Sequence, residues 1–253
     1  MMKIALITGA TAGIGKATAE LFAKNGYNII ITGRRKDYLH GIENELKSLY
    51  KVQAISLCFD VRKLSEVENA IQNLPPEWKN ISVLVNNAGL AAGLSSIQEG
   101  SIDDWERMID TNVKGLLYVT RQVAPLMIKN GAGHIINIAS IAGKEVYANG
   151  NVYCASKHAV DALSKAMRID MLNQGIKVTN IAPGLVETEF SMVRFDGDKE
   201  RAKNVYKGFH PLTAEDIAET IFWTATRPAH VNINDIVITP TAQANSTNVL
   251  RKN

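Results

Sequence analysis

The residues of this chain that could do chemistry are a tyrosine and a lysine four positions apart, Tyr153 and Lys157, in a segment of helical pattern. Side chains at positions i and i+4 lie on one face of a helix, so the phenol and the ammonium can point into the same cavity. A neighbouring cation favours the phenolate. The pair indicates acid–base chemistry near neutral pH by a group whose ordinary pKa is about 10. Because Tyr-x-x-x-Lys is a short motif, this interpretation depends on other motifs that point to the same cavity.

A glycine-rich turn follows the first apolar run. Its glycines permit a tight turn and close backbone approach, and the helix that follows offers free N–H groups to a pyrophosphate. The Gly-x-x-x-Gly-x-Gly spacing differs from the Gly-x-Gly-x-x-Gly of the general dinucleotide fingerprint. A turn that serves packing alone is the alternative, but the order strand, turn, helix favours phosphate binding. We expect cofactor contacts in this segment from Gly9, Thr11, Ala12, Gly13, Ile14 and Gly15.

Two arginines, Arg34 and Arg35, follow the second apolar run, where a dinucleotide fold meets the adenosine ribose. An acidic residue there would hydrogen-bond a free 2′-hydroxyl, whereas arginine accommodates a 2′-phosphate. Guanidinium groups match phosphate geometry through paired hydrogen bonds, and no carboxylate occurs before Asp37. The alternative is a solvated charge pair at a helix start. The sequence therefore favours NADP over NAD as the cofactor.

Polar residues also follow the third and fourth apolar runs. Asp60, followed by Val61, can accept a hydrogen bond from the adenine amino group or cap the next turn, and the residues leave both interpretations open. Asn87 lies in the segment Asn-Asn-Ala-Gly, whose small residues would let the backbone approach a ribose or a nicotinamide. An ordinary Asx-Gly turn is the alternative there.

Short apolar runs alternate along the chain with longer amphipathic segments. We predict strands over 3–8, 28–32, 52–59, 82–86, 134–139, 177–182 and 235–239, and helices over 14–25, 36–49, 65–73, 103–130, 151–174 and 214–227. Apolar runs without strict alternation are typical of strands covered on both faces of a parallel sheet. The rhythm predicts an α/β protein with one doubly wound parallel sheet and helices on both faces. Capping patterns predict helix starts at Ser65, Ser101 and Thr213.

Length and composition narrow the class of protein. A chain of 253 residues with 46% hydrophobic and 21% charged residues suits a globular protein, and no linker or repeat divides it, so residues 1–253 are predicted to form one domain. The net charge of +3 comes without a basic run, which argues against a nucleic-acid or membrane surface. No signal peptide is visible, and no apolar stretch approaches the ~20 residues of a membrane span. Cys58, expected to be buried, and Cys154 form no disulfide framework, which fits the reducing cytoplasm.

The motifs converge, because ligands of an open α/β sheet bind beyond the carboxyl ends of its strands. Two further polar residues join them: Ser140 follows the fifth predicted strand, and Asn112 lies within 103–130. The whole set of motifs has the order and spacing found in the short-chain dehydrogenase/reductase family, which the chain thus resembles. The chain resembles this family over essentially its whole length, and the resemblance implies a Rossmann-type fold that binds NADP. The matching segments are TGATAGIG, NNAG, YCASK and Pro183-Gly184 followed by Thr188.

The resemblance also implies roles for individual residues. Tyr153 would exchange the proton with the substrate, and Lys157 would lower the phenol's pKa and bind the nicotinamide ribose. Ser140 would hydrogen-bond the substrate oxygen, and Asn112 would hold a water in the proton path. The helices over 103–130 and 151–174 would form the interfaces of a homotetramer, and no metal is implied. Further cofactor contacts are implied at Pro183, Gly184, Val186 and Thr188.

A closer resemblance is to the NADP-dependent 3-hydroxy acid dehydrogenases within that family. It implies hydride transfer between the nicotinamide and the C3 hydroxyl or carbonyl of a short 3-hydroxy acid such as serine, allo-threonine or 3-hydroxypropionate. A broad carbonyl reductase, a 3-oxoacyl reductase and a non-catalytic NADP-binding sensor or scaffold are the alternatives. The resemblance is carried by segments outside the catalytic motifs: LPPEW at 74–78, DWE at 104–106, MIDTN at 108–112, GLVETEFS at 184–191, VRF at 193–195, GD at 197–198 and PAHVNIN at 228–234.

The longest irregular stretch, 184–211, contains only a short helical piece near 199–206. A loop of this length in a compact domain is usually a functional flap or a disordered segment. It carries Arg194, a candidate clamp for a substrate carboxylate, although an exposed loop arginine is the alternative. We expect Ser140, Tyr153 and Arg194 to contact the substrate.

Overall fold

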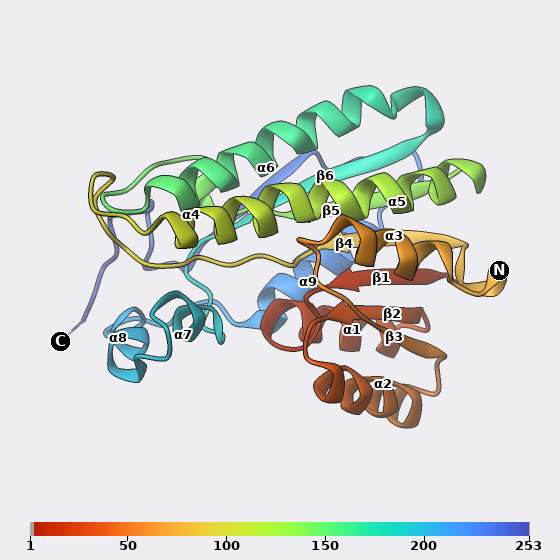
Figure 1. Ribbon diagram of the computed structural model, residues 1–253, viewed down its shortest axis with the longest axis horizontal. Coiled ribbons are helices and arrows are strands. Elements are labelled where there is room, and N and C mark those ends of the chain that lie inside the picture. The colour runs from red at the N-terminus through yellow and green to blue at the C-terminus, as the bar shows by residue number, and fades with distance from the viewer. Residues whose placement is uncertain (1–2, 253) are drawn as a thin grey trace.

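A seven-stranded parallel sheet forms the centre of the molecule, with the strand order β3-β2-β1-β4-β5-β6-β7. The computed structural model describes residues 3–252, and residues 1, 2 and 253 lie outside the described part. The predicted doubly wound α/β class is confirmed, since helices cover both faces of the sheet (Figure 1). The strands are β1 (Ile4–Thr8), β2 (Asn28–Gly33), β3 (Ala54–Cys58), β4 (Ile81–Asn86), β5 (Gly133–Ile138), β6 (Ile176–Pro183) and β7 (Asp235–Ile238).

The helices form two layers that bury separate apolar clusters. Helices α3, α5 and α6 cover one face of the sheet, and α1, α2 and α9 cover the other. Successive side chains of β1 serve the two layers in turn: Ile4 and Leu6 join the first cluster, Ala5 and Ile7 the second. The helices are α1 (Gly13–Lys24), α2 (Lys36–Tyr50), α3 (Leu64–Gln72), α4 (Ile102–Ile109), α5 (Leu116–Lys129), α6 (Asn151–Asp170), α7 (Phe190–Arg194), α8 (Lys199–Asn204) and α9 (Ala214–Ala225), with 3₁₀ turns η1 (Pro76–Trp78), η3 (Ile141–Gly143) and η4 (Leu172–Gln174).

Two of the three predicted helix starts are confirmed by their caps. Ser101 accepts a hydrogen bond from the backbone N–H of Asp104 at the start of α4. Thr213 and Asp216 form a complete capping box at the start of α9, each side chain accepting from the other residue's backbone.

The predicted start at Ser65 is wrong. Helix α3 begins at Leu64 and its N-cap residue is Lys63, so Ser65 lies inside the first turn. The Lys63 N–H donates to the Asp60 carbonyl, and the Asp60 N–H donates to the Glu66 carboxylate at 2.9 Å. Because of these hydrogen bonds, the helix starts before Ser65.

A π-helical turn, η2 (Asp110–Gly115), interrupts the segment predicted as one helix over 103–130. It separates α4 from α5, and its i→i+5 hydrogen bonds widen the backbone locally, a feature that is frequent at functional sites. Gly115 permits the packing of this turn, because a Cβ there would lie 2.7 Å from the Val61 side chain. Asn112 lies inside the turn and is buried.

Cys58 is exposed, which contradicts the expectation of a buried thiol. It is the last residue of β3, and β3 is the edge strand, so its apolar run is only partly covered. Cys154 is buried, and both cysteines are free thiols. None of the helices between residues 3 and 252 is long and apolar enough to cross a membrane.

The stretch 184–211 contains two short helices, α7 and α8, so the helical piece expected near 199–206 is one of two. Both lie beside the carboxyl ends of the strands, where the chain's C-terminal segment also ends (Figure 1). That segment contacts the stretch from outside. The Arg251 guanidinium donates to the Lys207 and Val205 carbonyls, and the Lys252 N–H donates to the Gly208 carbonyl at 2.7 Å.

His134, in β5, is a buried imidazole with one hydrogen-bond partner. Thr179 donates its hydroxyl hydrogen to the Ile233 carbonyl, so it accepts from His134 Nε2 at 2.8 Å. No partner of His134 Nδ1 exists among the described residues. A proton on Nδ1 would therefore create a buried charge without an acceptor. Burial, and secondly the charge of Lys177, lower the pKa of His134 to about 3.

We predict that this histidine destabilises the protein as the pH falls. Its pKa is about 6.5 in the unfolded chain and about 3 in the folded one. The unfolded state therefore binds the proton first, and stability present above pH 6.5 is lost on acidification. The loss approaches about 1.4 kcal/mol per pH unit below pH 6. Urea unfolding from pH 7.5 to 5 should show a steeper loss in the wild type than in His134→Gln. Equal slopes would contradict the assignment.

Candidate active site

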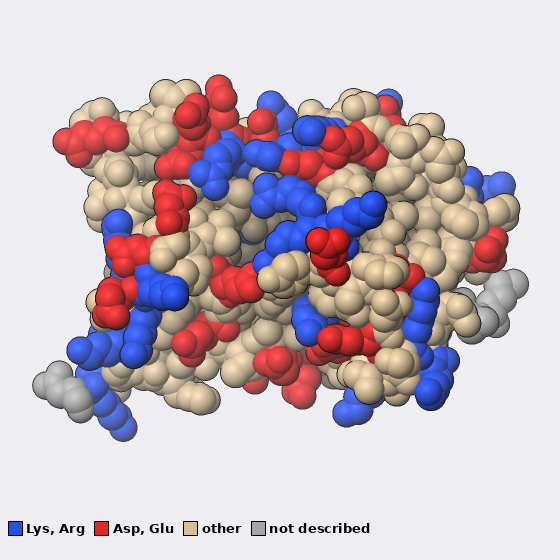
Figure 2. Space-filling view, turned by 60° about the horizontal axis from the view of Figure 1, so that its bottom comes forward, with Lys and Arg blue, Asp and Glu red and all other residues tan. Residues whose placement is uncertain are grey.

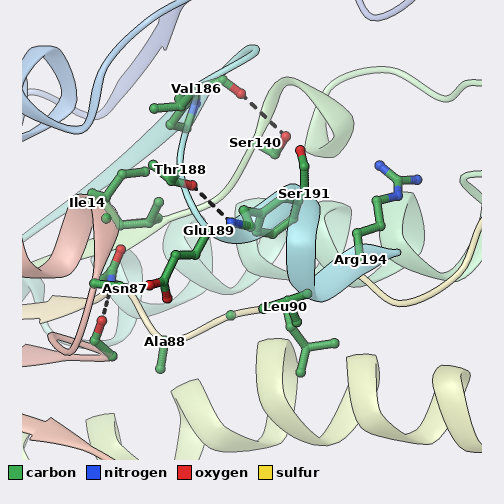
Figure 3. A pocket seen from close by; sticks show the side chains of 18 of the residues that line it. Ile14, Asn87, Ala88, Leu90, Ser140, Val186, Thr188, Glu189, Ser191 and Arg194 are labelled. Carbon is green, nitrogen blue, oxygen red and sulfur yellow. Dashed lines mark hydrogen bonds between the residues drawn. The ribbon is translucent and has the colours of Figure 1, made fainter. Parts of the chain in front are cut away.

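A pocket of about 540 Å³ opens at the carboxyl ends of the strands. In Figure 3, Ile14 and Asn87 lie at one end of it and Arg194 at the other, with Ser140 between them. Two predicted site residues, Gly15 and Asn112, lie behind its lining, and the structure brings the others together around one cavity. Those that line it are Gly9, Thr11, Ala12, Gly13, Ile14, Arg34, Arg35, Asp60, Val61, Asn87, Ser140, Tyr153, Lys157, Pro183, Gly184, Val186, Thr188 and Arg194.

The glycine turn between β1 and α1 has the geometry of a phosphate cradle. Gly9 and Gly13 adopt positive φ angles of 66° and 51°, which favour glycine. No described side chain caps the N-terminus of α1 at Ala12, its first turn holds no acidic residue, and Ala12, Gly13 and Ile14 line the pocket. The Asn87 amide donates to the Gly9 carbonyl at 3.1 Å and braces the turn from β4. Such an arrangement suits an anionic group.

The two arginines after β2 differ in their surroundings. The Arg35 guanidinium donates to the Thr11 hydroxyl at 2.8 Å, pairs with the Glu189 carboxylate at 3.2 Å and stacks on the Tyr38 ring at 4.6 Å. It therefore joins the glycine turn to the stretch that follows β6. Arg34 lines the pocket, and no hydrogen bond joins its side chain to another described residue. Figure 2 shows Lys and Arg side chains gathered around a hollow on this face of the molecule.

The Asp60 side chain caps the turn that follows it, which is one of the two interpretations that the sequence left open. Its carboxylate accepts from the backbone N–H of Arg62 at 3.0 Å and forms an ion pair with the Arg62 guanidinium at 2.6 Å. Burial opposes ionisation of Asp60, but the hydrogen bonds from Arg62 outweigh it and hold the pKa of the carboxyl below its ordinary value. An adenine contact of Asp60 stays a prediction.

Ser140, Tyr153 and Lys157 meet at the floor of the pocket. Ser140 is the N-cap residue of η3, where its hydroxyl accepts from the Ala142 N–H at 3.1 Å and donates to the Pro183 carbonyl at 3.4 Å, and its effect on the pKa of the Tyr153 phenol places it beside that group. Helix α6 supplies Tyr153 and Lys157, which are 8% and 5% exposed. The Lys157 ammonium donates to the Ile138 carbonyl at 2.9 Å and lies 6.0 Å from the centroid of the Tyr153 ring.

Burial dominates the ionisation of both groups. It raises the pKa of the Tyr153 phenol well above its ordinary value, and Tyr147 and Cys154 add to the rise, while the hydrogen bond with Ser140 and the charge of Arg194 oppose it. Burial also lowers the pKa of the Lys157 ammonium to about 8. Lys157 is not among the causes that shift the pKa of the phenol, and a lowering of that pKa by Lys157 stays a prediction.

The Asn112 side chain holds three hydrogen bonds. It accepts from the Leu90 N–H at 2.8 Å, and its amide donates to the Leu90 carbonyl at 2.8 Å and to the Ser156 hydroxyl at 3.0 Å. Ser156 in turn donates to the Tyr153 carbonyl at 2.8 Å. The side chain thus ties the loop after β4 to the helix that carries Tyr153, and a water contact of Asn112 stays a prediction.

Arg194 closes the far end of the pocket, from α7. Its guanidinium carbon lies 5.6 Å from the ring centroids of both Tyr147 and Tyr153. Its Nε donates to the Gly93 carbonyl at 3.3 Å, and the Gly93 N–H donates to its backbone carbonyl at 3.1 Å. The alternative of a fully solvated loop arginine is therefore wrong, since the side chain is fixed against the loop after β4.

The pocket is also lined by residues that the sequence did not single out, among them Tyr147 and Gln243. Tyr147 is half-buried next to Arg194, and burial raises the pKa of its phenol, opposed by the charge of Arg194 and a hydrogen bond with it. Gln243 is buried and accepts from the Leu185 N–H at 2.9 Å, across 58 residues of sequence. For Tyr147, the sequence signal was an aromatic residue six positions before Tyr153. For Gln243, the sequence held no signal, because its contact with Leu185 joins distant parts of the chain.

Comparisons with known proteins place this geometry among dehydrogenases. Residues 3–199 match the family model described as short chain dehydrogenase. The chain is 48% identical to an NADP-dependent 3-hydroxy acid dehydrogenase of Salmonella typhi, over 95% of this chain and 96% of that protein. It is 45% identical to sulfoacetaldehyde reductase 2 of Chromohalobacter salexigens, over 96% of each. A solved closed form of serine dehydrogenase complexed with NADP+ superposes with a TM-score of 0.92 at 45% identity, covering 99% of this chain and 100% of that one.

We predict that Gly15→Ala distorts the phosphate cradle, because a Cβ at Gly15 would lie 2.4 Å from the Gly9 carbonyl oxygen. Overpacking against fixed backbone costs about 1–3 kcal/mol. The variant should lower the unfolding free energy by that amount in urea melts. Gly41→Ala is the matched control, since it is also a helical glycine and its Cβ would meet nothing within 4 Å. It should be neutral or stabilising by up to about 1 kcal/mol. Equal effects of both variants would refute the close approach.

Proposed function

Because the chain belongs to the short-chain dehydrogenase family, as the order of its motifs predicts, we propose that it is an NADP-dependent oxidoreductase of short 3-hydroxy acids. The reaction is hydride transfer between the nicotinamide and C3 of the hydroxy or oxo acid. The observation that carries the choice of an acid is the Arg194 guanidinium, held 5.6 Å from the ring of Tyr153. Dehydrogenases of 3-hydroxy acids and of serine are among the similar proteins.

The residues at the strand ends fit an NADP molecule. The N–H groups at the start of α1 would hold the pyrophosphate, and Arg34, whose side chain makes no hydrogen bond to another described residue, would take the 2′-phosphate. Asp60 and Val61 border the adenine end. The bound cofactor supplies or accepts the hydride. At its nicotinamide end the pocket offers Asn87, Pro183, Gly184, Val186 and Thr188.

The proton moves through Tyr153. The phenol donates its proton to the substrate carbonyl during reduction, and during oxidation the phenolate, formed when Lys157 has taken its proton, accepts the proton of the hydroxyl, while Ser140 holds the same oxygen. The raised pKa keeps the phenol protonated at neutral pH, which is the form that reduction requires. Lys157 returns the proton from its side of the pocket, with a pKa of about 8 that lets it change charge near neutrality. Asn112, in the π-helical turn, would hold the water that completes this path.

The acidic group of the substrate would bind to Arg194 with Tyr147 beside it. A guanidinium pairs with a carboxylate through two parallel hydrogen bonds, and the phenol adds a third donor. A sulfonate is a similar anionic group and could bind to the same Arg194 and Tyr147 donors. A sulfoacetaldehyde reductase is among the similar proteins. Neutral carbonyl compounds and acyl thioesters lack this anion, so the clamp favours free acids over the substrates of a broad carbonyl or 3-oxoacyl reductase. An intact proton-transfer group argues against a pure NADP-binding sensor.

We also propose that the enzyme is a cytoplasmic homotetramer. Apolar side chains remain exposed on the two long helices of one layer, notably Leu117 and Ile128 on α5 and Ile169 on α6. Contact with a second copy would cover them. The two free thiols, Cys58 and Cys154, fit a reducing compartment.

The central test of this function is Tyr153→Phe. It removes the hydroxyl that moves the proton, so kcat should fall by roughly 10²- to 10⁴-fold, while the Kd for NADP changes little. Initial rates of NADPH formation with serine, allo-threonine and 3-hydroxypropionate, alongside isethionate and neutral alcohols, measure both activity and substrate class. Tyr50→Phe, at the end of α2 outside the pocket, is the control. Turnover retained by Tyr153→Phe would overturn the mechanism.

Arg194→Ala tests the clamp. It should raise KM for 3-hydroxy acids about 10- to 100-fold, the worth of a charged hydrogen bond, and leave KM for neutral alcohols almost unchanged. Arg201→Ala is the matched control, because Arg201 also stacks on a ring of this stretch, 4.5 Å from Phe195, without lining the pocket. Equal increases for acids and neutral alcohols would reject the clamp while leaving the reaction itself intact.

A further inference from the structure

Behind the turn that carries Ser140, the ammonium of Lys144 lies between two carboxylates. Its Nζ bonds Asp161 Oδ1 on α6 at 2.5 Å and Asp235 Oδ2 at the start of β7 at 2.8 Å. The Asn180 amide on β6 donates to the same two carboxylates, at 3.1 and 2.7 Å. The cluster therefore joins the turn η3 to a helix and to two neighbouring strands.

The Lys144–Asp161 pair is the most enclosed ion pair between described residues, with side chains 21% and 12% exposed. Burial opposes the charge of Asp161, but the hydrogen bonds from Lys144 and Lys165 outweigh it and lower the pKa of the carboxyl. Burial likewise opposes the charge of Lys144, and the bonds to Asp161 and Asp235 outweigh it and raise the pKa of the ammonium. Both groups are charged at neutral pH, and a pair shielded from water holds its geometry more firmly than an exposed one.

The turn η3 is fastened to α6 at two points one helical turn apart. At the first, Gly143 lies against the backbone of Lys157, where a Cβ would come 2.5 Å from the Lys157 carbonyl oxygen. At the second, Lys144, which ends the turn, reaches Asp161 four residues farther along the helix. Ser140 begins the same short turn and lines the same pocket as Tyr153, which lies four residues before Lys157, and its hydroxyl affects the pKa of the Tyr153 phenol.

We propose that Lys144 is a positioning residue, whose ion pair with Asp161 fixes the turn so that the Ser140 hydroxyl stays on the Tyr153 phenol. Lys144 does not line the pocket and acts only through Ser140. The inference rests on the proposed reaction, since it needs a proton transfer that Ser140 and Tyr153 share.

The chain contains a matched control for this role. Lys165 pairs with the same carboxylate of Asp161, through Oδ2 at 2.6 Å. It lies on α6 itself and is 61% exposed, so it cannot hold the turn. Lys165→Met removes the same charge from the same carboxylate as Lys144→Met, and only the latter releases η3.

The experiment compares Lys144→Met, Lys144→Arg and Lys165→Met with the wild type in a hydroxy-acid oxidation assay. Rates are normalised to the fraction of molecules that bind NADP, which counts only folded protein. In Lys144→Met we expect kcat to fall about 10- to 100-fold, the effect of a displacement of roughly 1 Å, with Kd for NADP unchanged. Lys144→Arg should restore most of kcat, and Lys165→Met should stay within twofold of the wild type.

The pH profile separates positioning from a general loss of stability. The groups that face the Tyr153 phenol are Ser140, Tyr147, Cys154, Lys157 and Arg194. Of these, Lys144→Met disturbs Ser140, whose hydrogen bond lowers the phenol's pKa. The rising limb of kcat against pH should therefore move to higher pH in Lys144→Met and stay in place in Lys165→Met. Identical kcat and profiles in both variants would overturn the proposal. A wild type without hydride transfer on any acid would instead overturn the proposed function.

Discussion

A buried ammonium sets the requirement from which the rest of the site follows. Lys157 is almost fully enclosed, and a buried cation is tolerated only where fixed polar groups face it. The Ile138 carbonyl, 2.9 Å from its Nζ, supplies that group from the end of β5. The helix α6 must therefore keep its register against this strand end. Ser140 stands two residues after Ile138, and Tyr153 one helical turn before Lys157, so the same register brings the hydroxyl and the phenol together.

The pocket is closed by contacts between segments that are distant in sequence. The stretch after β6 is joined to the loop after β4 through Arg194 and Gly93, and to the glycine turn through Glu189, Arg35 and Thr11. Each link is partly exposed and individually weak. Together they hold the stretch over the pocket from two sides.

The sequence predicted those parts of the site that depend on local pattern. Neighbouring residues determine the strand ends, the glycine turn and the Tyr153–Lys157 spacing. A parallel sheet then brings its strand ends together, independently of the other contacts in the fold. The π-helical turn at Asn112 was missed, because periodicity cannot distinguish it from a continued helix. The raised pKa of Tyr153 was missed too, because the burial that causes it depends on packing, whereas the motif shows only the neighbouring Lys157.

The two ends of the pocket illustrate the same difference for specificity. At the proposed phosphate end, backbone N–H groups and glycines would do the binding, so the pattern of residue types almost determines the chemistry. At the proposed substrate end, a single guanidinium gains meaning only from its position: Arg194 lies beside the rings of Tyr147 and Tyr153. An arginine elsewhere on the stretch would be a solvated charge. Substrate choice in such a fold can therefore change through small shifts of one loop, while the chemistry at Tyr153 is held by the sheet and α6.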